Sequence, residues 1–239
     1  MAGEILRLEG VTRDFNDAGK TIHALKKTDF SVKAGEFVAV IGPSGSGKST
    51  FLTIAGGLQN PTSGKVFING TEITNLSLKN LSKVRLQSVG FILQASNLVP
   101  FLTVEKQLLF IDKVMHRQSD RKAIENLFET LGIAKLKAKY PSELSGGERQ
   151  RAAIAKVLYG SSDLILADEP TASLDTKKAF EVVKLLADET HNLGKATIMV
   201  THDERLLEYC DAVYEMRDGE LTRRAAPNAK IARSKKIML

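Results

Sequence analysis

The sequence predicts one α/β domain around a buried parallel sheet, chiefly because it contains three nearly continuous apolar runs. They span residues 36–41, 163–167 and 196–201. Such runs are typical of strands that helices cover on both faces. A predicted helix at 176–192 separates the last two runs, which fits a right-handed crossover. A chain of 239 residues, 43% of them hydrophobic, is long enough to bury a core in a single domain.

A second, smaller sheet is predicted from alternating apolar and polar residues. This alternation occupies residues 4–13, 23–33 and 65–69, and the last segment is followed by Asn69-Gly70. Alternation is typical of half-buried antiparallel strands, and Asn-Gly favours a tight turn. These segments therefore predict an antiparallel β subdomain beside the parallel sheet.

The middle of the chain is predicted to be mostly helical, from residue 103 to residue 159. Apolar residues recur at helical spacing from Ile124 to Leu131, with Ser119 as a candidate N-cap and Gly132 as a candidate C-cap. We therefore expect a helical subdomain, about residues 95–158, inserted into the α/β core.

The net charge of +6 is concentrated at the C-terminus. Residues 222–239 contain six basic residues and no acid: Arg223, Arg224, Lys230, Arg233, Lys235 and Lys236. Removing these six from the 34 basic residues leaves 28, equal to the 28 acidic residues. We therefore predict a flexible basic tail at 223–239, either solvated or in contact with anionic lipid, and no nucleic-acid partner.

The sequence also predicts a reducing, cytoplasmic setting. Cys210 is the only cysteine, so no internal disulfide can form. No apolar run approaches the roughly 18 residues needed to cross a bilayer, and the N-terminus does not resemble a signal peptide. Any membrane role is therefore expected to come from a partner.

A glycine-rich loop follows the first apolar run and precedes an apolar helical stretch at 51–58. It matches the pattern G-x-x-x-x-G-K-[ST], the signature of a P-loop NTPase. Glycines let backbone N–H groups point inward at a polyphosphate, and the following helix adds its positive dipole end. We expect Lys48 to reach the β- and γ-phosphates of ATP and Ser49 to bind Mg2+. The predicted phosphate-binding residues are Gly42, Ser44, Gly45, Ser46, Gly47, Lys48, Ser49 and Thr50.

Two adjacent acids, Asp168 and Glu169, end the second apolar run. Parallel sheets place their ligand sites at the carboxyl ends of strands. We expect Asp168 to bind Mg2+ and Glu169 to polarise the water that attacks the γ-phosphate. Two acids at a strand end can also be plain surface residues, and the loop at Lys48 favours the functional interpretation.

His202 follows the third apolar run, where an imidazole can hydrogen-bond the γ-phosphate. A histidine in isolation is more often structural. Its position after a strand of the same predicted sheet favours a role at the nucleotide.

A second glycine motif, Leu144-Ser145-Gly146-Gly147-Glu148-Arg149-Gln150-Arg151, precedes a helix. By spacing alone it could be another anion-binding loop or a helix cap. The motif resembles the ABC signature, and together with the loop at Lys48, Asp168-Glu169, Ser173-Leu174-Asp175 and His202, residues 4–221 resemble an ABC-type ATPase. This resemblance implies a RecA-like core with an antiparallel β subdomain and an inserted helical signature subdomain, together spanning residues 1–222.

The resemblance implies a head-to-tail homodimer with ATP between the subunits. Residues of one subunit would then contact the nucleotide held by Lys48 of the other. The residues expected to act in trans are Ser145, Gly146, Gly147, Glu148 and Asp175. For Asp175, helix capping is an alternative role.

Two further nucleotide contacts are implied. Phe15 would stack on adenine in place of the more usual tyrosine; the alternative is an ordinary core phenylalanine. Gln94 would contact Mg2+ and the attacking water, the alternative being a solvated glutamine.

Among ABC ATPases, a dedicated transporter subunit fits best. Chromosome-maintenance relatives carry a long coiled coil and translation-linked relatives carry two ATPase domains, and this chain has neither. Such subunits bind a cytoplasmic helix of an integral membrane permease. The resemblance places this contact at Leu98, Val99 and Phe101, although each of these residues could instead be buried in the core.

Within the family, the phosphate loop, Asn97-Leu98-Val99-Pro100 and residues 166–175 resemble the branch that serves MacB-like permeases. Residues 94–110 and 201–220 are similar to the ATPase of bacterial haem exporters. We therefore expect a haem-efflux ATPase at the cytoplasmic face of the membrane. The alternatives are peptide, macrolide or lipoprotein transport, or a regulatory cell-division type that transports nothing.

Overall fold

The computed structural model describes residues 3–17 and 19–224. Its larger sheet has six strands in the order β10-β9-β3-β8-β7-β6. The three apolar runs form its buried strands β3 (Phe37–Ile41), β7 (Leu164–Asp168) and β8 (Ala196–Val200), which are parallel to one another. The prediction of a parallel α/β core is therefore confirmed.

Three strands of this sheet were not predicted. They are β6 (Val89–Ile92), β9 (Ala212–Arg217) and β10 (Glu220–Arg224). Strand β10 pairs with β9 up to Arg224. The predicted tail is therefore too long by two residues, 223 and 224, because both are hydrogen-bonded into the sheet. The rest of that prediction, residues 225–239, lies outside the described residues.

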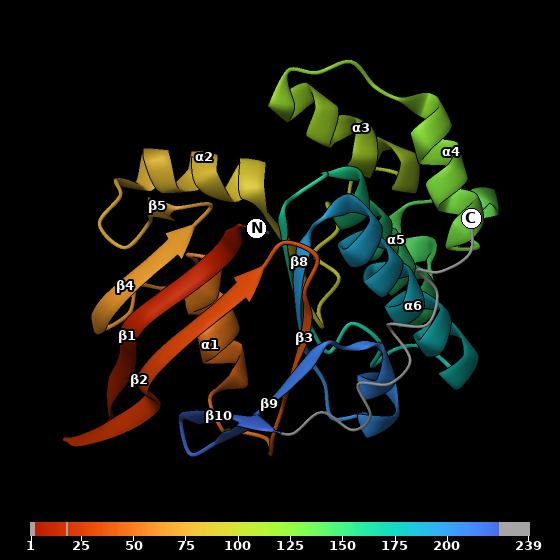
Figure 1. Cartoon of the computed structure of the whole chain (residues 1–239). Helices are drawn as coiled ribbons and strands as arrows, with labels where there is room; N and C mark the ends of the chain where they lie inside the picture. Colours follow the sequence, from red (N-terminus) through yellow and green to blue (C-terminus); the bar gives the residue numbers. More distant parts are fainter. Residues whose placement is uncertain (1–2, 18, 225–239) are drawn as a thin grey trace, which may run out of the picture.

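The second sheet is antiparallel, as predicted, and lies to one side of the larger sheet (Figure 1). Its order is β2-β1-β4-β5, with β1 (Glu4–Asp17), β2 (Lys20–Lys33), β4 (Ser63–Ile68) and β5 (Thr71–Glu72). Asn69 and Gly70 form the predicted turn between β4 and β5, with φ values of 49° and 74°. Helix α1 (Lys48–Ala55) packs between the two sheets through Phe51 and Leu52.

In the helical segment, α5 packs against β6 of the large sheet, and α3 and α4 pack against α5 as an outer layer (Figure 1). Its helices are α3 (Val104–Met115), α4 (Arg121–Thr130) and α5 (Gly146–Tyr159), with short 3-10 turns at Ala134–Leu136 and Pro141–Glu143. The remaining helices are α2 (Leu78–Ser88), α6 (Thr176–Leu193) and the 3-10 helix Glu204–Tyr209. No helix in residues 3–17 and 19–224 is long and apolar enough to cross a membrane.

One predicted helix cap was wrong. Helix α4 is capped by Asp120, whose Oδ1 accepts from the backbone N–H of Ala123 at 2.9 Å, and not by Ser119. A carboxylate at this position is also stabilised by the positive end of the helix dipole. Gly132 follows the helix with a φ of 63°, the left-handed conformation that ends helices.

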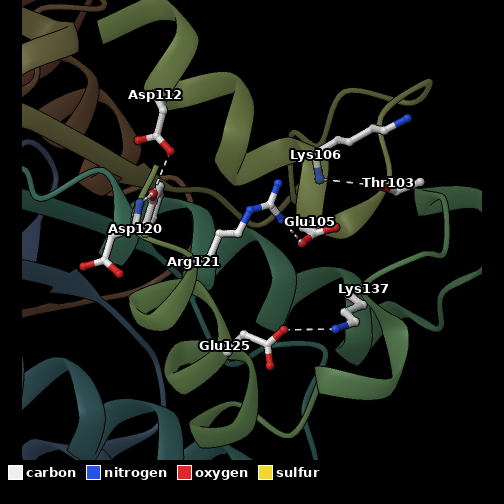
Figure 2. A network of polar contacts seen from close by, with 9 residues as sticks. Thr103, Glu105, Lys106, Asp112, Asp120, Arg121, Glu125 and Lys137 are labelled. Carbon is white, nitrogen blue, oxygen red and sulfur yellow. Dashed lines mark hydrogen bonds and ion pairs between the residues drawn. The ribbon is translucent and has the colours of Figure 1, made fainter. Parts of the chain in front are cut away.

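Polar contacts hold the helical layer together (Figure 2). Arg121 on α4 pairs with Glu105 on α3 at 3.3 Å, and Lys137 pairs with Glu125 at 3.0 Å. Asp112 is buried, and accepts hydrogen bonds from Tyr159 Oη and Arg117 Nε, both at 2.6 Å. Burial raises the pKa of Asp112, but these hydrogen bonds outweigh burial and hold the pKa below its usual value.

We expect Asp112→Asn to lower the free energy of unfolding by about 2–3 kcal/mol, because an amide keeps only one of the two oxygens that accept from Arg117 and Tyr159. Since the pKa of Asp112 is depressed in the folded state, its contribution is present above the unfolded pKa of about 4 and is lost as the pH falls below it. Urea unfolding at pH 7 and pH 3 measures both effects. Asp120→Asn is the matched control and should change stability by less than about 0.5 kcal/mol, since asparagine also caps helices. Equal effects of the two variants would contradict this prediction.

Candidate nucleotide-binding site

A cavity of about 500 Å³ opens at the carboxyl ends of β3, β7 and β8. Eleven of the predicted site residues line it: Gly42, Ser44, Gly45, Gly47, Lys48, Ser49, Thr50, Gln94, Asp168, Glu169 and His202. They come from segments more than 150 residues apart in the chain. The parallel sheet brings them together because its strands end at one edge.

The loop after β3 has a backbone that only glycine can adopt at two positions. Gly42 and Gly47 have φ values of 146° and 106°. A Cβ at Gly42 would lie 2.1 Å from the carbonyl oxygen of Met216, and one at Gly47 would lie 2.2 Å from that of Ala24. The loop is therefore wedged between β9 and β2, and its shape is fixed before any ligand binds.

Lys48 is the first residue of α1, and its ammonium bends back over the loop. Its Nζ donates to the carbonyl oxygens of Gly42 at 2.8 Å and Pro43 at 2.6 Å. A cation at a helix N-terminus that is held by two loop carbonyls is positioned to receive an anion.

Ser49 and Asp168 meet across the cavity floor. Ser49 Oγ donates to Asp168 Oδ2 at 2.9 Å, which joins the start of α1 to the end of β7. A hydroxyl and a carboxylate oxygen are hard ligands of the kind that Mg2+ binds together with phosphate oxygens. These two oxygen ligands therefore fit a magnesium ion.

Glu169 follows β7 in a left-handed conformation, with a φ of 48°. Its backbone N–H donates to the carbonyl oxygen of Val200, and its Oε1 lies 2.9 Å from Nδ1 of His202. The Glu169 side chain is only 18% exposed, whereas that of His202 is 76% exposed. A positive φ costs a glutamate energy, and such strain often occurs where a side chain must point into a site.

Two predicted nucleotide contacts do not line the cavity. Ser46 is buried under the loop, and its Oγ has no hydrogen-bond partner within the described part of the chain. Phe15 lies on β1 and is 37% exposed, so the alternative of an ordinary core phenylalanine is wrong. The guanidinium of Arg13 covers the Phe15 ring at 4.6 Å from its centroid and also donates to the carbonyl oxygen of Asn60.

The residues expected to act in trans also lie outside the cavity. Ser145 caps α5 in a reciprocal arrangement: its Oγ accepts from the N–H of Glu148, and its own N–H donates to Glu148 Oε2 at 2.7 Å. This hydrogen bond from the backbone of Ser145 lowers the pKa of Glu148. Asp175 caps α6 through the N–H of Lys178, so its alternative capping role is present in the structure.

A second crevice, of about 460 Å³, separates the loop at 94–98 from the start of α5. Gln94 lines both this crevice and the nucleotide cavity, while Gly146 and Ser173 line only the crevice. Of the predicted permease contacts, Phe101 is 75% exposed, whereas Leu98 packs partly against the core. Val99 is held through its backbone by the Gln107 amide.

Sequence reasoning missed three cavity-lining residues: Ala24, Ala172 and Val200. Ala24 belongs to the other sheet and meets the loop through its backbone, so no side-chain signal could have revealed it. Ala172 and Val200 lie close to residues that were predicted, and they contribute apolar surface.

Comparison with known proteins identifies the family. The sequence pattern of the ABC transporter family matches residues 25–172. Two relatives are named hemin import ATP-binding protein HrtA. The protein of Staphylococcus haemolyticus is 41% identical over 218 residues, covering 90% of this chain and 98% of the relative. That of Staphylococcus saprophyticus is 41% identical over 219 residues, covering 91% and 98%.

Solved structures agree with this assignment. The dimeric structure of MJ0796, described as a bacterial ABC transporter cassette, has a TM-score of 0.85 at 33% identity, covering 92% of this chain and 99% of that one. A dimeric post-hydrolysis state of the same cassette, bound to ADP and Pi, matches equally well. The structure of cbiO1 from Clostridium perfringens, part of the cbiONQ complex, has a TM-score of 0.77 at 32% identity, covering 94% and 89%. The phosphate loop, the acidic pair and these matches together show that the chain belongs to the ABC transporter family. Within that family it is an ATP-hydrolysing subunit.

Proposed function

We propose that the cavity holds the triphosphate of ATP, with the loop at 42–50 wrapped around the β- and γ-phosphates. The fixed glycine backbone and the ammonium of Lys48 support this role. On binding, phosphate oxygens replace the carbonyl oxygens of Gly42 and Pro43 as partners of the Lys48 ammonium. Charge-assisted hydrogen bonds to phosphate are stronger than those to neutral carbonyls, so the exchange favours binding.

Ser49, Asp168 and Gln94 would hold Mg2+ beside these phosphates. The ion would supply positive charge to the β- and γ-phosphate oxygens during cleavage. The 2.9 Å contact between Ser49 Oγ and Asp168 Oδ2 supports a shared ligand position.

Glu169 is proposed as the residue that polarises the attacking water. Its carboxylate is largely shielded from solvent and faces the cavity. His202 orients this carboxylate through the 2.9 Å contact and is exposed enough to touch the γ-phosphate as well. Gln94, which also lines the cavity, would help to position the water.

The active assembly is proposed to be a homodimer. The N-terminal end of α5 lies outside the cavity of its own subunit and carries Ser145, Gly146 and Glu148. The similar cassette MJ0796 was solved as a dimer. In a head-to-tail pair this helix end would contact the γ-phosphate on the partner subunit. Phe15 would stack on adenine through the ring face that Arg13 does not cover.

At the level of the cell, we propose that the dimer drives a MacB-like membrane permease in haem efflux, from the cytoplasmic face of the membrane. The observation that supports haem as cargo is the 41% identity to hemin-transport relatives over 90% of this chain. The names of those relatives give import as the direction. Efflux is proposed because residues 94–110 and 201–220 resemble the ATPase of bacterial haem exporters.

This proposal is tested in proteoliposomes containing the transporter, purified through a tag on this subunit. We expect haem to raise ATP hydrolysis severalfold, and haem to move toward the side opposite the ATPase. Accumulation on the ATPase side would show import. Stimulation by a cationic peptide or a macrolide instead of haem would identify another cargo, and no transport of any of these would favour a regulatory ATPase.

A further inference from the structure

One half-buried lysine is not explained by nucleotide binding. Lys156 lies in the C-terminal half of α5, half-buried, and burial lowers the pKa of its ammonium. Within residues 3–17 and 19–224 no carboxylate pairs with it. Its Nζ donates to the backbone carbonyl oxygen of Asn97 at 2.8 Å. The stem of a half-buried lysine packs much as a methionine would, so the hydrogen bond from its ammonium to Asn97 is what distinguishes Lys156.

The contact fixes a loop that has no regular structure of its own. Residues 95–102, here called the docking loop, lie between β6 and α3. Asn97 within it has a φ of 44°, which turns its carbonyl toward Lys156. The loop is therefore fastened by its backbone, which leaves the exposed side chain of Phe101 free for a partner, while Leu98 packs partly against the core.

A second side chain fastens the same loop to the helical layer. Gln107 on α3 is 2% exposed, and its amide both donates to and accepts from the backbone of Val99, at 2.7 and 3.0 Å. It also donates to the carbonyl oxygen of Leu102 at 2.9 Å. Both clamps come from the helical layer, so the loop should move with that layer.

We infer that Lys156 is a positioning residue that fixes the docking loop to α5, so that a permease helix displacing the loop also displaces the Ser145 end of that helix. Ten residues of helix separate Lys156 from the start of α5, a rigid lever of about 15 Å. The inference rests on the proposed function, since it takes the docking loop as the permease contact and the Ser145 end as the contact with the partner subunit's ATP.

The test compares the isolated subunit with the reconstituted transporter, using Lys156→Met. We expect the isolated subunit to keep its kcat and KM for ATP within about twofold, because Lys156 does not touch the nucleotide cavity. In the transporter we expect kcat to fall at least about fivefold with KM unchanged, because permease movement no longer reaches the helix end. Lys156→Arg should restore most of the loss, and Lys184→Met, at an exposed position on α6, should change neither preparation.

Equal losses in both preparations, or a transporter with wild-type kcat, would overturn the inference. If Lys156→Met lowers the melting temperature of the subunit so far that it cannot be purified, Gln107→Leu removes the second clamp and must show the same selective loss. Failure of the proposed function would give another result, since no membrane protein would then co-purify with the wild-type subunit.

Discussion

Glu169→Gln should lower kcat about 10²- to 10³-fold while leaving ATP binding intact, because glutamine keeps the length of the side chain but not its basicity. The amide oxygen can still accept from Nδ1 of His202, as Glu169 Oε1 does at 2.9 Å, so the side chain should keep its place. One negative charge beside the γ-phosphate is removed, so affinity should not fall. Steady-state ATPase assays and fluorescent-nucleotide titration measure the two quantities separately.

The same variant should accumulate as an ATP-bound dimer, since closure precedes the step that it blocks. Light scattering after gel filtration with ATP should show about twice the subunit mass of 26.1 kDa. Glu129→Gln is the control: it removes an exposed carboxylate from α4, outside the cavity, and should hydrolyse ATP at the wild-type rate. Hydrolysis by Glu169→Gln within about threefold of wild type would contradict the assigned role.

The sequence could predict which residues share one cavity because its signals are local. The glycine loop and the acidic pair each follow a short apolar run of the kind typical of a buried strand. Once those runs are placed in one parallel sheet, the loop, the acids and His202 must share an edge. The geometry of the sheet thus turns three separate motifs into one site.

Other features depended on tertiary contacts and could not be predicted. Strand β6 contains Gly90, which weakens the local strand pattern; the glycine is needed because a Cβ there would lie 2.5 Å from Val157 on α5. Strand β10 lies at the edge of the sheet and is rich in charged residues. The sequence pattern therefore assigned its last two residues, 223 and 224, to the basic tail. For the cap of α4, two adjacent residues were both chemically suitable, and only the backbone decides for Asp120.

The clamps on the docking loop were missed for a similar reason. Asn97, Val99 and Leu102 are held through backbone atoms, and backbone contacts leave no pattern in a sequence. Lys156 reads as one more polar residue on an amphipathic helix. Its hydrogen bond to the carbonyl oxygen of Asn97 appears only in the structure.

Lys48→Ala should weaken ATP binding about 30- to 100-fold, a loss of about 2–3 kcal/mol, because a charge-assisted contact with the phosphates disappears. The Lys48 ammonium already lies over the loop, held by the carbonyl oxygens of Gly42 and Pro43, so little ordering is needed when ATP binds. Unlike Glu169→Gln, this variant should fail to form the ATP-dependent dimer at nucleotide concentrations that saturate the wild type. Equilibrium titration with a fluorescent ATP analogue measures the affinity. Thermal melting without nucleotide checks that the loop stays folded, and an unchanged Kd in a folded variant would refute the loop as the triphosphate site.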